Sequence, residues 1–190
     1  MRKLKLQIQM SIDGFIAGPN GEMDFLERNW DEELKQYVGD LTQPVDTIVL
    51  GRKLAEGFIP YWAEVSKNPG NPEVEAGKKF TDTPKVVFTR TLTDCQWDNT
   101  VLARGGLAEE INRLKGQDGA DIIAYGGGEF VSGLIREGLI DDYFLMINPA
   151  AIGRGMPVFE DLKAMQMMKL VKATPFACGI VGLHFRPERN

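Results

Sequence analysis

The apolar residues of this chain follow two spacings in turn, one typical of strands and one typical of helices. Residues 3–12 alternate apolar and polar side chains, as in a strand with one buried face. Continuous apolar runs, which suit buried strands, occupy 45–51, 85–89, 100–103 and 120–125. Apolar residues recur at helical spacing within 30–41, 107–114 and 130–135. The alternation predicts an α/β fold in three layers, with a mostly parallel central sheet and helices on both faces.

Capping residues and prolines indicate where two of the helices begin and end. Asn29 is a candidate N-cap for the first helix, because acidic residues follow it in the first turn. A second helix is expected to begin at Arg52. The next stretch, 60–84, contains Pro60, Pro69, Pro72 and Pro84. It is therefore expected to be a long excursion at the surface.

The pattern changes after residue 141. Three stretches, "DYFLMINPAAI", "MKLVKAT" and "GIVGLHF", have the character of strands, and no helical stretch separates them. The fold is therefore expected to end in a mainly antiparallel β run. No internal repeat interrupts the chain, and residues 1–190 are expected to form a single domain.

Composition and charge narrow the classes of partner. The chain is 43% hydrophobic and 26% charged with a net charge of −5, and its basic residues are scattered, which argues against a nucleic-acid partner. No apolar stretch is long enough for a membrane span, so a cytoplasmic protein without a membrane partner is expected. Cys95 and Cys178 lack a CxxC partner, so reduced thiols and no metal site are expected.

The run Gly126–Gly128 lies between a predicted strand and a predicted helix. In that place backbone N–H groups and the positive end of the helix point together, and missing Cβ atoms let a phosphate approach. The Rossmann pattern is not met, because Val131 stands where its third glycine belongs, and no Gly-Lys-Ser/Thr of a P-loop follows. A tight turn without a ligand remains the alternative.

Two other predicted strand ends contain groups that bind phosphate. The stretch "LGRK" at 50–53 enters a helix with two cations, and "FTRT" at 88–91 offers a guanidinium between two hydroxyls. Because ligands of open α/β sheets bind at the carboxyl ends of strands, the three segments are expected to converge on a dinucleotide. Arg90 suits the 2′-phosphate of NADPH, although a solvated loop charge is the alternative.

At this point the chain resembles the dihydrofolate-reductase-like family, in particular the reductase domain of bacterial riboflavin-biosynthesis deaminase-reductases and its stand-alone relatives. The resemblance rests on "MSIDGFIAGPNGEMDF", "DTIVLGRK", "VVFTRT", "IAYGGGEFVSGLI", "GLIDDYFLMINPAAIGRGMPVF" and "GIVGLHF", in that order. It implies a dihydrofolate-reductase-like fold, a homodimer and an NADPH-dependent reductase, similar either to 5-amino-6-(5-phosphoribosylamino)uracil reductase or to dihydrofolate reductase. The resemblance also implies a cis peptide bond between Gly126 and Gly127, and a mobile loop at 14–25 that closes over nicotinamide and substrate.

The resemblance implies a set of residues that bind the cofactor. They are Gly51, Arg52, Lys53, Thr89, Arg90, Gly126, Gly127, Gly128, Glu129 and Phe130. The chain also departs from the family pattern. Leu54 replaces a hydroxyl residue that contacts phosphate, Phe15 stands where the riboflavin enzymes have a basic residue, and their Asp-Asp-Pro segment has no counterpart. No zinc-deaminase signature occurs in the chain, so a deaminase activity is not expected.

Hydride transfer places the difficult chemistry on the cofactor, so the protein needs at most one proton donor. Asp13 is the candidate catalytic residue, although an Asp before Gly also suits a simple turn. Phe25, Trp30 and Trp62 are candidate walls for a flat substrate, and each is equally suited to the core. The carboxylate that holds a pterin in folate reductases corresponds to one of Asp24, Glu27 and Asp31. His184, in a terminal strand, is assigned no catalytic role.

The sequence therefore predicts an NADPH-dependent oxidoreductase that acts on a small heterocyclic substrate. Two alternatives remain at this point. The first is a non-catalytic nucleotide-binding or regulatory protein on the same fold, favoured if an aromatic side chain fills the substrate pocket. The second is an interaction protein in which the glycines are only turns, favoured if no dinucleotide binds.

Overall fold

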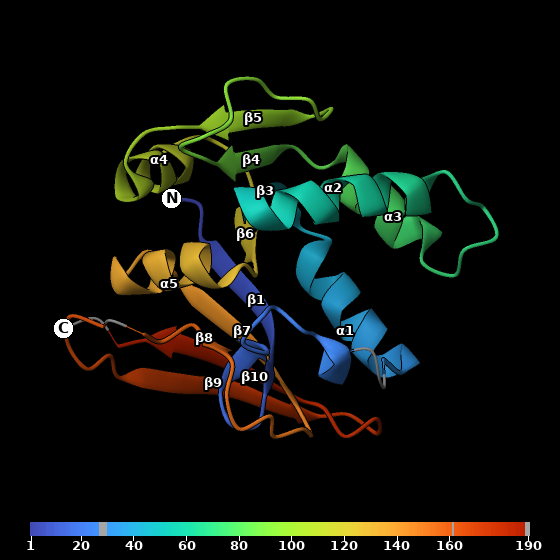
Figure 1. Ribbon diagram of the computed structural model, residues 1–190, viewed down its shortest axis with the longest axis vertical. Coiled ribbons are helices and arrows are strands. Elements are labelled where there is room, and N and C mark those ends of the chain that lie inside the picture. Colours follow the sequence, from blue (N-terminus) through green and yellow to red (C-terminus); the bar gives the residue numbers. More distant parts are fainter. Residues whose placement is uncertain (27–29, 161, 189–190) are drawn as a thin grey trace.

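The computed structural model describes residues 1–26, 30–160 and 162–188, which fold around an eight-stranded sheet (Figure 1). Its order is β5 (Thr100–Ala103), β4 (Lys85–Phe88), β3 (Val45–Gly51), β6 (Asp121–Tyr125), β1 (Leu4–Ser11), β7 (Asp142–Asn148), β10 (Val181–Pro187) and β9 (Met168–Pro175). The pairs from β5 to β7 are parallel, and β10 is antiparallel to both β7 and β9. The mostly parallel sheet and the antiparallel C-terminal run are confirmed.

Helices cover both faces of the sheet and enclose two apolar cores. On one face lie α1 (Glu32–Thr42), α2 (Arg52–Ser66) and α3 (Val74–Asp82), whose buried side chains share a core with those of β3 and β7. On the other face lie α4 (Leu107–Lys115) and α5 (Gly128–Arg136), which pack on β1 and β6. The three-layer architecture follows from the two periodicities in the sequence. No helix among the described residues is both long and apolar enough to cross a membrane.

The start of α1 is fixed by Asp31, whose carboxylate Oδ1 accepts a hydrogen bond from the Leu34 amide at 2.8 Å. This N-cap satisfies one of the amide groups that the first turn leaves unpaired. Asn29, the cap expected from the sequence, lies outside the described residues, as does Glu27. The expected acidic first turn is present as Glu32 and Glu33.

The prediction that residues 60–84 form a long surface excursion is wrong for most of that segment. The helix α2 continues through Pro60 to Ser66, and α3 forms a second helix after a short turn. The two helices pack closely, since a Cβ on Gly77 would lie only 2.7 Å from the Ser66 backbone nitrogen. Ala55, Ile59 and Val65 are buried at helical spacing. This packing outweighs the hydrogen bond that the proline removes.

The expected loop at 14–25 is partly regular. Within it β2 (Phe15–Ala17) pairs with β8 (Met156–Pro157), and η1 (Asp24–Leu26) is a turn of 3₁₀ helix. A Cβ on Gly155 would overlap the Ala17 carbonyl oxygen, so the two strands approach as closely as only glycine permits. We call this β2–β8 pair, with the turns that join it to β1 and β7, the flap.

A buried carboxylate is paired at the amino edge of the sheet. Asp142 Oδ1 lies 2.6 Å from His184 Nε2 and 2.6 Å from Arg186 Nε, and Lys3 Nζ lies 3.4 Å from Oδ2. His184 also stacks on Phe144, with the ring centroids 4.2 Å apart. The histidine therefore makes structural contacts at the edge opposite the glycine run.

Candidate functional site

The candidate site lies at the carboxyl edge of the sheet, where β3 and β6 are parallel neighbours. The helix that follows β3 packs on one face of the sheet, and the helix that follows β6 packs on the other. Neighbouring strands whose connections leave in opposite directions open a crevice at their carboxyl ends, where ligands of α/β sheets bind. The topology therefore places two of the predicted segments side by side (Figure 1).

Both helices at this crevice begin on a glycine. Gly51 is the N-cap of α2 and Gly127 is the N-cap of α5, and neither helix has a side-chain cap. The positive ends of the two helices therefore meet with amide groups that no side chain of the cap residues satisfies. Close packing explains Gly51, because a Cβ there would lie 2.7 Å from Phe130 Cβ. The arrangement suits an extended anion such as a pyrophosphate.

The three consecutive glycines differ in what they do. Gly127 has a φ of 99°, a conformation that side chains with a Cβ rarely adopt. A Cβ on Gly126 would meet no atom within 4 Å, so this position faces open space. Gly128 lies against the flap, with Ile16 Cδ1 3.7 Å and Met156 Cβ 3.9 Å from its ideal Cβ. The cis bond implied between Gly126 and Gly127 is wrong, because the described peptide bonds are trans and the positive φ of Gly127 makes the turn instead.

Arg90 follows the end of the next strand along the edge. Gly51 is in register with Phe88, the last residue of β4, so the "FTRT" loop begins beside the start of α2. The Thr89 hydroxyl accepts hydrogen bonds from the Thr91 and Leu92 amides at 3.1 and 3.0 Å, which fixes this loop. Arg90 is exposed and its side chain makes no hydrogen bond or ion pair with the described residues. It is available for a ligand.

The side chains of the other charged and aromatic cofactor candidates contact side chains of α2, α5 or β4. Arg52 donates to Glu56 along its own helix at 2.7 Å. Lys53 Nζ lies 4.0 Å from a Glu129 carboxylate oxygen, so these exposed side chains bridge the starts of α2 and α5. Phe130 packs on Phe88 with the ring centroids 5.1 Å apart, and it also touches Gly51. Phe130 therefore holds the two glycine segments together.

Sequence reasoning missed a further glycine start on the same edge. The helix α4 follows β5 and has Gly106 as its N-cap, again without a side-chain cap. The preceding Arg104 donates to the Thr93 carbonyl oxygen and so ties the ends of β4 and β5 together. The signal was the same as at 126–128, a strand followed by glycines and then a helix. Recognising this signal would have added the carboxyl end of β5 to the strand ends predicted to bind the cofactor.

The carboxylate of Asp13 is used to hold the flap. It accepts hydrogen bonds from the Ile152 amide at 3.1 Å and from the Gly153 amide at 2.7 Å, which lie in the turn after β7. The hydrogen bond from Ser11 and that from Gly153 keep the pKa of Asp13 below its ordinary value. These contacts support the turn role of Asp13, and its catalytic role stays a prediction.

The predicted substrate walls do not gather at the glycines. Phe25 is half-buried in η1, and Trp30 packs against the core beneath α1. Trp62 lies in an aromatic cluster between α2 and α3, with its ring centroid 4.6 Å from that of Phe80. It is ten residues along α2 from Arg52, which is about 15 Å of helix. A substrate role for these three aromatic residues stays a prediction.

The candidate pterin carboxylates are also accounted for. Both carboxylate oxygens of Asp31 already accept a hydrogen bond within the protein. The second oxygen accepts from the Cys178 amide at 2.9 Å, and the first caps α1. Asp24 is exposed in η1, and Glu27 lies outside the described residues. Among the described candidates, only Asp24 has a carboxylate free of these structural bonds.

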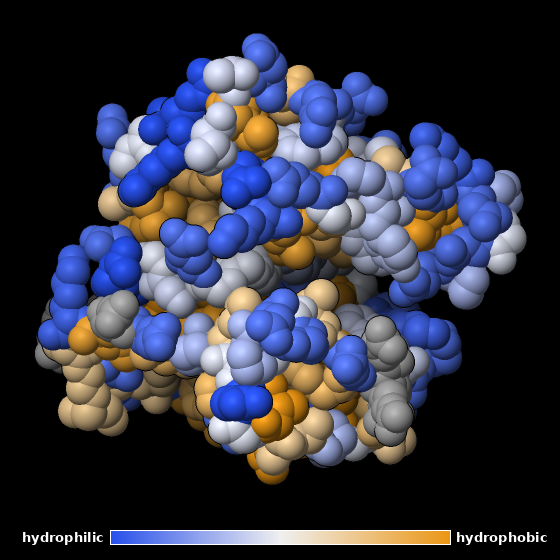
Figure 2. Space-filling model, in the orientation of Figure 1, coloured by the Kyte–Doolittle hydropathy of each residue, from blue (hydrophilic) through white to orange (hydrophobic). Residues whose placement is uncertain are grey.

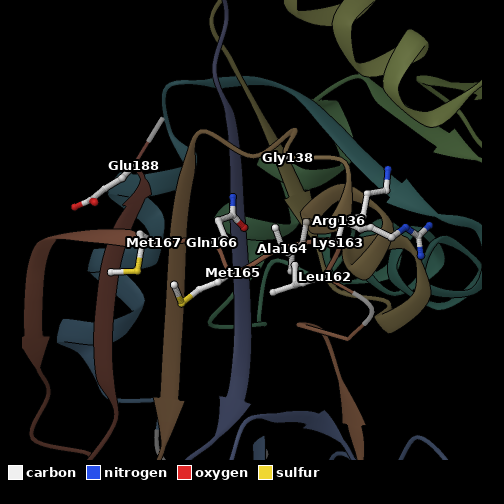
Figure 3. Close-up of a pocket in the computed structure, with 10 residues that line it drawn as sticks. Arg136, Gly138, Leu162, Lys163, Ala164, Met165, Gln166, Met167 and Glu188 are labelled. Atoms are coloured by element: carbon white, nitrogen blue, oxygen red, sulfur yellow. The ribbon is translucent and has the colours of Figure 1, made fainter. Parts of the chain in front are cut away.

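A separate hollow of about 330 Å³ lies at the amino edge of the sheet (Figure 3). Its lining comes from the end of α5, the segment before β9 and the end of β10. Figure 3 labels Arg136, Lys163 and Glu188 among these residues, and none of the predicted site residues is there. We therefore place the candidate site at the carboxyl edge.

The fold and the crevice together define a dihydrofolate-reductase-like protein. The chain belongs to the family of the RibD C-terminal domain, whose family model matches residues 2–182. The relative named "Uncharacterized protein YyaP" of Bacillus subtilis (strain 168) is 32% identical over 181 residues, which are 95% of this chain and 92% of the relative.

Solved structures agree on the fold. A putative riboflavin biosynthesis protein from Shewanella sp. PV-4 has a TM-score of 0.74 at 22% identity, with all of both chains covered. Dihydrofolate reductase from Enterococcus faecalis, solved in complex with NADP(H), has a TM-score of 0.62 at 16% identity, with 98% of this chain and 97% of that chain covered. The predicted family and fold are confirmed, and the chain is reductase-like.

Proposed function

We propose that this chain is a reductase that transfers a hydride from NADPH to a small heterocyclic substrate. The observation that supports the proposal best is the meeting of two glycine-capped helix starts at the β3–β6 crevice, with the unpaired Arg90 at the next strand end. Gly126 supports it further, since the space beside it is open. The family and the NADP(H)-bound neighbour agree with this choice of cofactor.

In this proposal the residues of the chain bind and orient the cofactor and the substrate, and NADPH supplies the hydride when bound. The amides at the starts of α2 and α5 hold the pyrophosphate. Arg90 pairs with the 2′-phosphate, because a guanidinium matches a phosphate with two parallel hydrogen bonds. The flap, held by Asp13, closes the carboxyl edge beside Gly128 and limits the access of water.

The substitution Gly126→Val tests the cofactor site. Its side chain fits the protein, because no atom lies within 4 Å of the Cβ position and φ is outside the left-handed region. Valine would fill the space that the phosphate needs, so we expect NADPH binding to be lost while the fold is kept. Gly127→Val is a poorer test, since the φ of 99° would strain any side chain.

The affinity for NADPH is measured by calorimetric titration into wild type, Gly126→Val and a control variant, and circular dichroism checks that each protein is folded. Gly39→Val, on an open position of α1, is the matched control and should bind NADPH like wild type. A folded Gly126→Val protein with wild-type affinity would exclude the glycine run as the phosphate site.

Turnover separates the reductase from a non-catalytic nucleotide-binding protein on the same fold. NADPH oxidation should be followed at 340 nm with pterins, flavin precursors and quinones as acceptors. We expect oxidation with at least one ring compound. Tight NADPH binding without oxidation by any of them would favour the non-catalytic alternative.

A further inference from the structure

Two neighbouring strands place amide side chains on an otherwise apolar inner face. In β1, Leu4, Leu6 and Ile8 belong to the core beneath α4 and α5. Since side chains alternate along a strand, Gln7 and Gln9 face α1, α2 and α3 instead. Asn148 ends β7 on that same face, two residues after Met146, which is part of the core there. Buried polar groups of this kind need hydrogen-bond partners.

The hydrogen bonds of the Gln9–Asn148 pair leave two polar atoms unsatisfied. Asn148 Nδ2 donates to Gln9 Oε1 at 2.9 Å and to the carbonyl oxygens of Met146 and Met10 at 3.2 and 3.4 Å. Because those carbonyls only accept, they fix which way the Asn148 amide points. Gln9 Nε2 and Asn148 Oδ1 are then buried without a hydrogen-bond partner among the described residues. The pair presents one free donor and one free acceptor.

The pair lies beside the candidate cofactor site. Gln7 is in register with Tyr125, the last residue of β6, so Gln9 lies about 7 Å further along β1, level with the glycine run. The helix α2 packs over β3 and β4, while Asp31 ties the start of α1 to the β9–β10 turn. The two helices diverge in Figure 1, and Figure 2 shows a hollow between α1 and the α2–α3 pair. Gln9 is partly exposed on the strand between them.

We propose that Gln9 and Asn148 are specificity-determining residues that read a neutral ring edge in which a carbonyl adjoins an N–H. This inference rests on the proposed reductase function, because it assigns the substrate half of the same crevice. The ring carbonyl would accept from Gln9 Nε2, and the ring N–H would donate to Asn148 Oδ1. A quinone offers only acceptors and would leave the asparagine oxygen unpaired, which a buried site penalises strongly.

A matched pair of ring compounds tests the assignment. Quinazoline-2,4-dione contains the carbonyl and N–H edge, and its 1,3-dimethyl derivative keeps the ring but has lost both N–H groups. Calorimetric titration into the NADP⁺-loaded protein should show the parent compound binding about tenfold more tightly, as expected for the loss of a satisfied hydrogen bond. Equal affinities, or no binding of the parent compound, would overturn the assignment.

Variants connect the preference to the pair. Asn148→Leu removes the acceptor for the ring N–H, so we expect it to lose the preference, whereas Gln9→Met removes only the donor to the carbonyl that both compounds keep, so we expect both affinities to fall and the preference to remain. Gln117→Met, on an exposed turn, is the matched control and should keep it. Circular dichroism checks the fold of each protein. A folded Asn148→Leu protein that retains the tenfold preference would also overturn the assignment.

The experiment distinguishes this inference from the proposed function. NADP⁺ and NADPH are titrated first, and failure of both to bind would contradict the cofactor site alone. The two diones are then titrated into the protein without nucleotide, where the same preference is expected because Gln9 and Asn148 belong to the fold. If the preference is absent both with and without bound nucleotide, the role assigned to Gln9 and Asn148 is contradicted, but the cofactor site is not.

Discussion

At the scale of single residues, the glycines at the carboxyl edge are glycine for different physical reasons. Gly51 leaves room for Phe130, Gly127 adopts a backbone conformation with positive φ, and Gly126 borders open space. Only the last of these three reasons points to a ligand. The sequence showed that the three positions are special, but it did not show which of them faces the ligand, because that depends on neighbours far along the chain.

Arg90→Ala tests the choice between NADPH and NADH at the same scale. Because Arg90 has no partner among the described residues, its loss should not disturb the fold. A charge-assisted hydrogen bond contributes about 1.5–3 kcal/mol, so NADPH affinity should fall by about tenfold to a hundredfold while NADH affinity stays unchanged. Added salt should reduce the wild-type preference for NADPH.

Titration of both cofactors into both proteins gives the measurement, and Arg136→Ala at the opposite edge of the sheet is the control. An equal loss for NADPH and NADH would place Arg90 at a phosphate that the two cofactors share. Unchanged affinity for both cofactors would remove Arg90 from the site.

At the scale of elements, α2 and α3 show how packing overrides local signals. Four prolines between 60 and 84 suggested a loop, yet the segment buries a helical stripe and forms two helices. One proline costs a helix about 3 kcal/mol in a host peptide, and burial of several apolar side chains offsets that cost. The contact at Gly77 joins the two helices.

Gly77→Val tests the α2–α3 contact. Its side chain would collide with the backbone of Ser66, so we expect the free energy of unfolding to fall by about 1–3 kcal/mol in urea denaturation. Gly39→Val, at an open position of α1, should lose less than half as much. Because valine has a higher helix propensity than glycine, propensity alone predicts no loss, and equal losses in the two variants would contradict the importance of the α2–α3 contact.

At the scale of the whole molecule, ion pairs at one edge of the sheet join the amino ends of β1 and β7 to the carboxyl half of β10. Burial of Asp142 acts to raise its pKa, but hydrogen bonds from Arg186 and His184 outweigh burial and hold the pKa below its ordinary value. A carboxyl whose pKa is lower in the folded state stabilises the fold above its unfolded pKa, near 3.9. That stabilisation is lost as the pH falls through the folded pKa.

Asp142→Asn tests this contribution. At pH 7 the variant should be less stable than wild type by about 3 kcal/mol, as for the loss of one partner of a buried ion pair. The difference should begin to shrink as the pH falls below about 4, because unfolded wild type then takes up a proton, and it should be smallest below the folded pKa, where folded wild type has lost the charge as well. Urea denaturation of both proteins between pH 7 and pH 3 measures how the free energy of unfolding changes with pH. A stability difference that does not change with pH would contradict the prediction.

The expected homodimer stays a prediction. The apolar residues on both faces of β7 are explained by the two cores, since Tyr143 and Leu145 belong to one core and Phe144 and Met146 belong to the other. The edge strand β9 exposes Leu170 and Val171, which suit pairing with a second copy. We expect sedimentation equilibrium to give twice the mass of the chain for wild type and the mass of a single chain for Val171→Lys. A wild-type monomer at tens of micromolar would contradict the prediction.

The sequence by itself determined most strands and helices, the sheet class and the glycine segments at the strand ends. These are local properties, since side-chain periodicity and missing Cβ atoms can be recognised within ten or fifteen residues. Only the tertiary structure decided that α2 and α3 replace a loop, that β2 pairs with β8, and that the Cys178 amide donates to the second carboxylate oxygen of Asp31. It alone showed the unsatisfied amides of Gln9 and Asn148 as neighbours. These features depend on tertiary contacts, which in the last three cases join residues more than a hundred positions apart, and no local sequence pattern contains them.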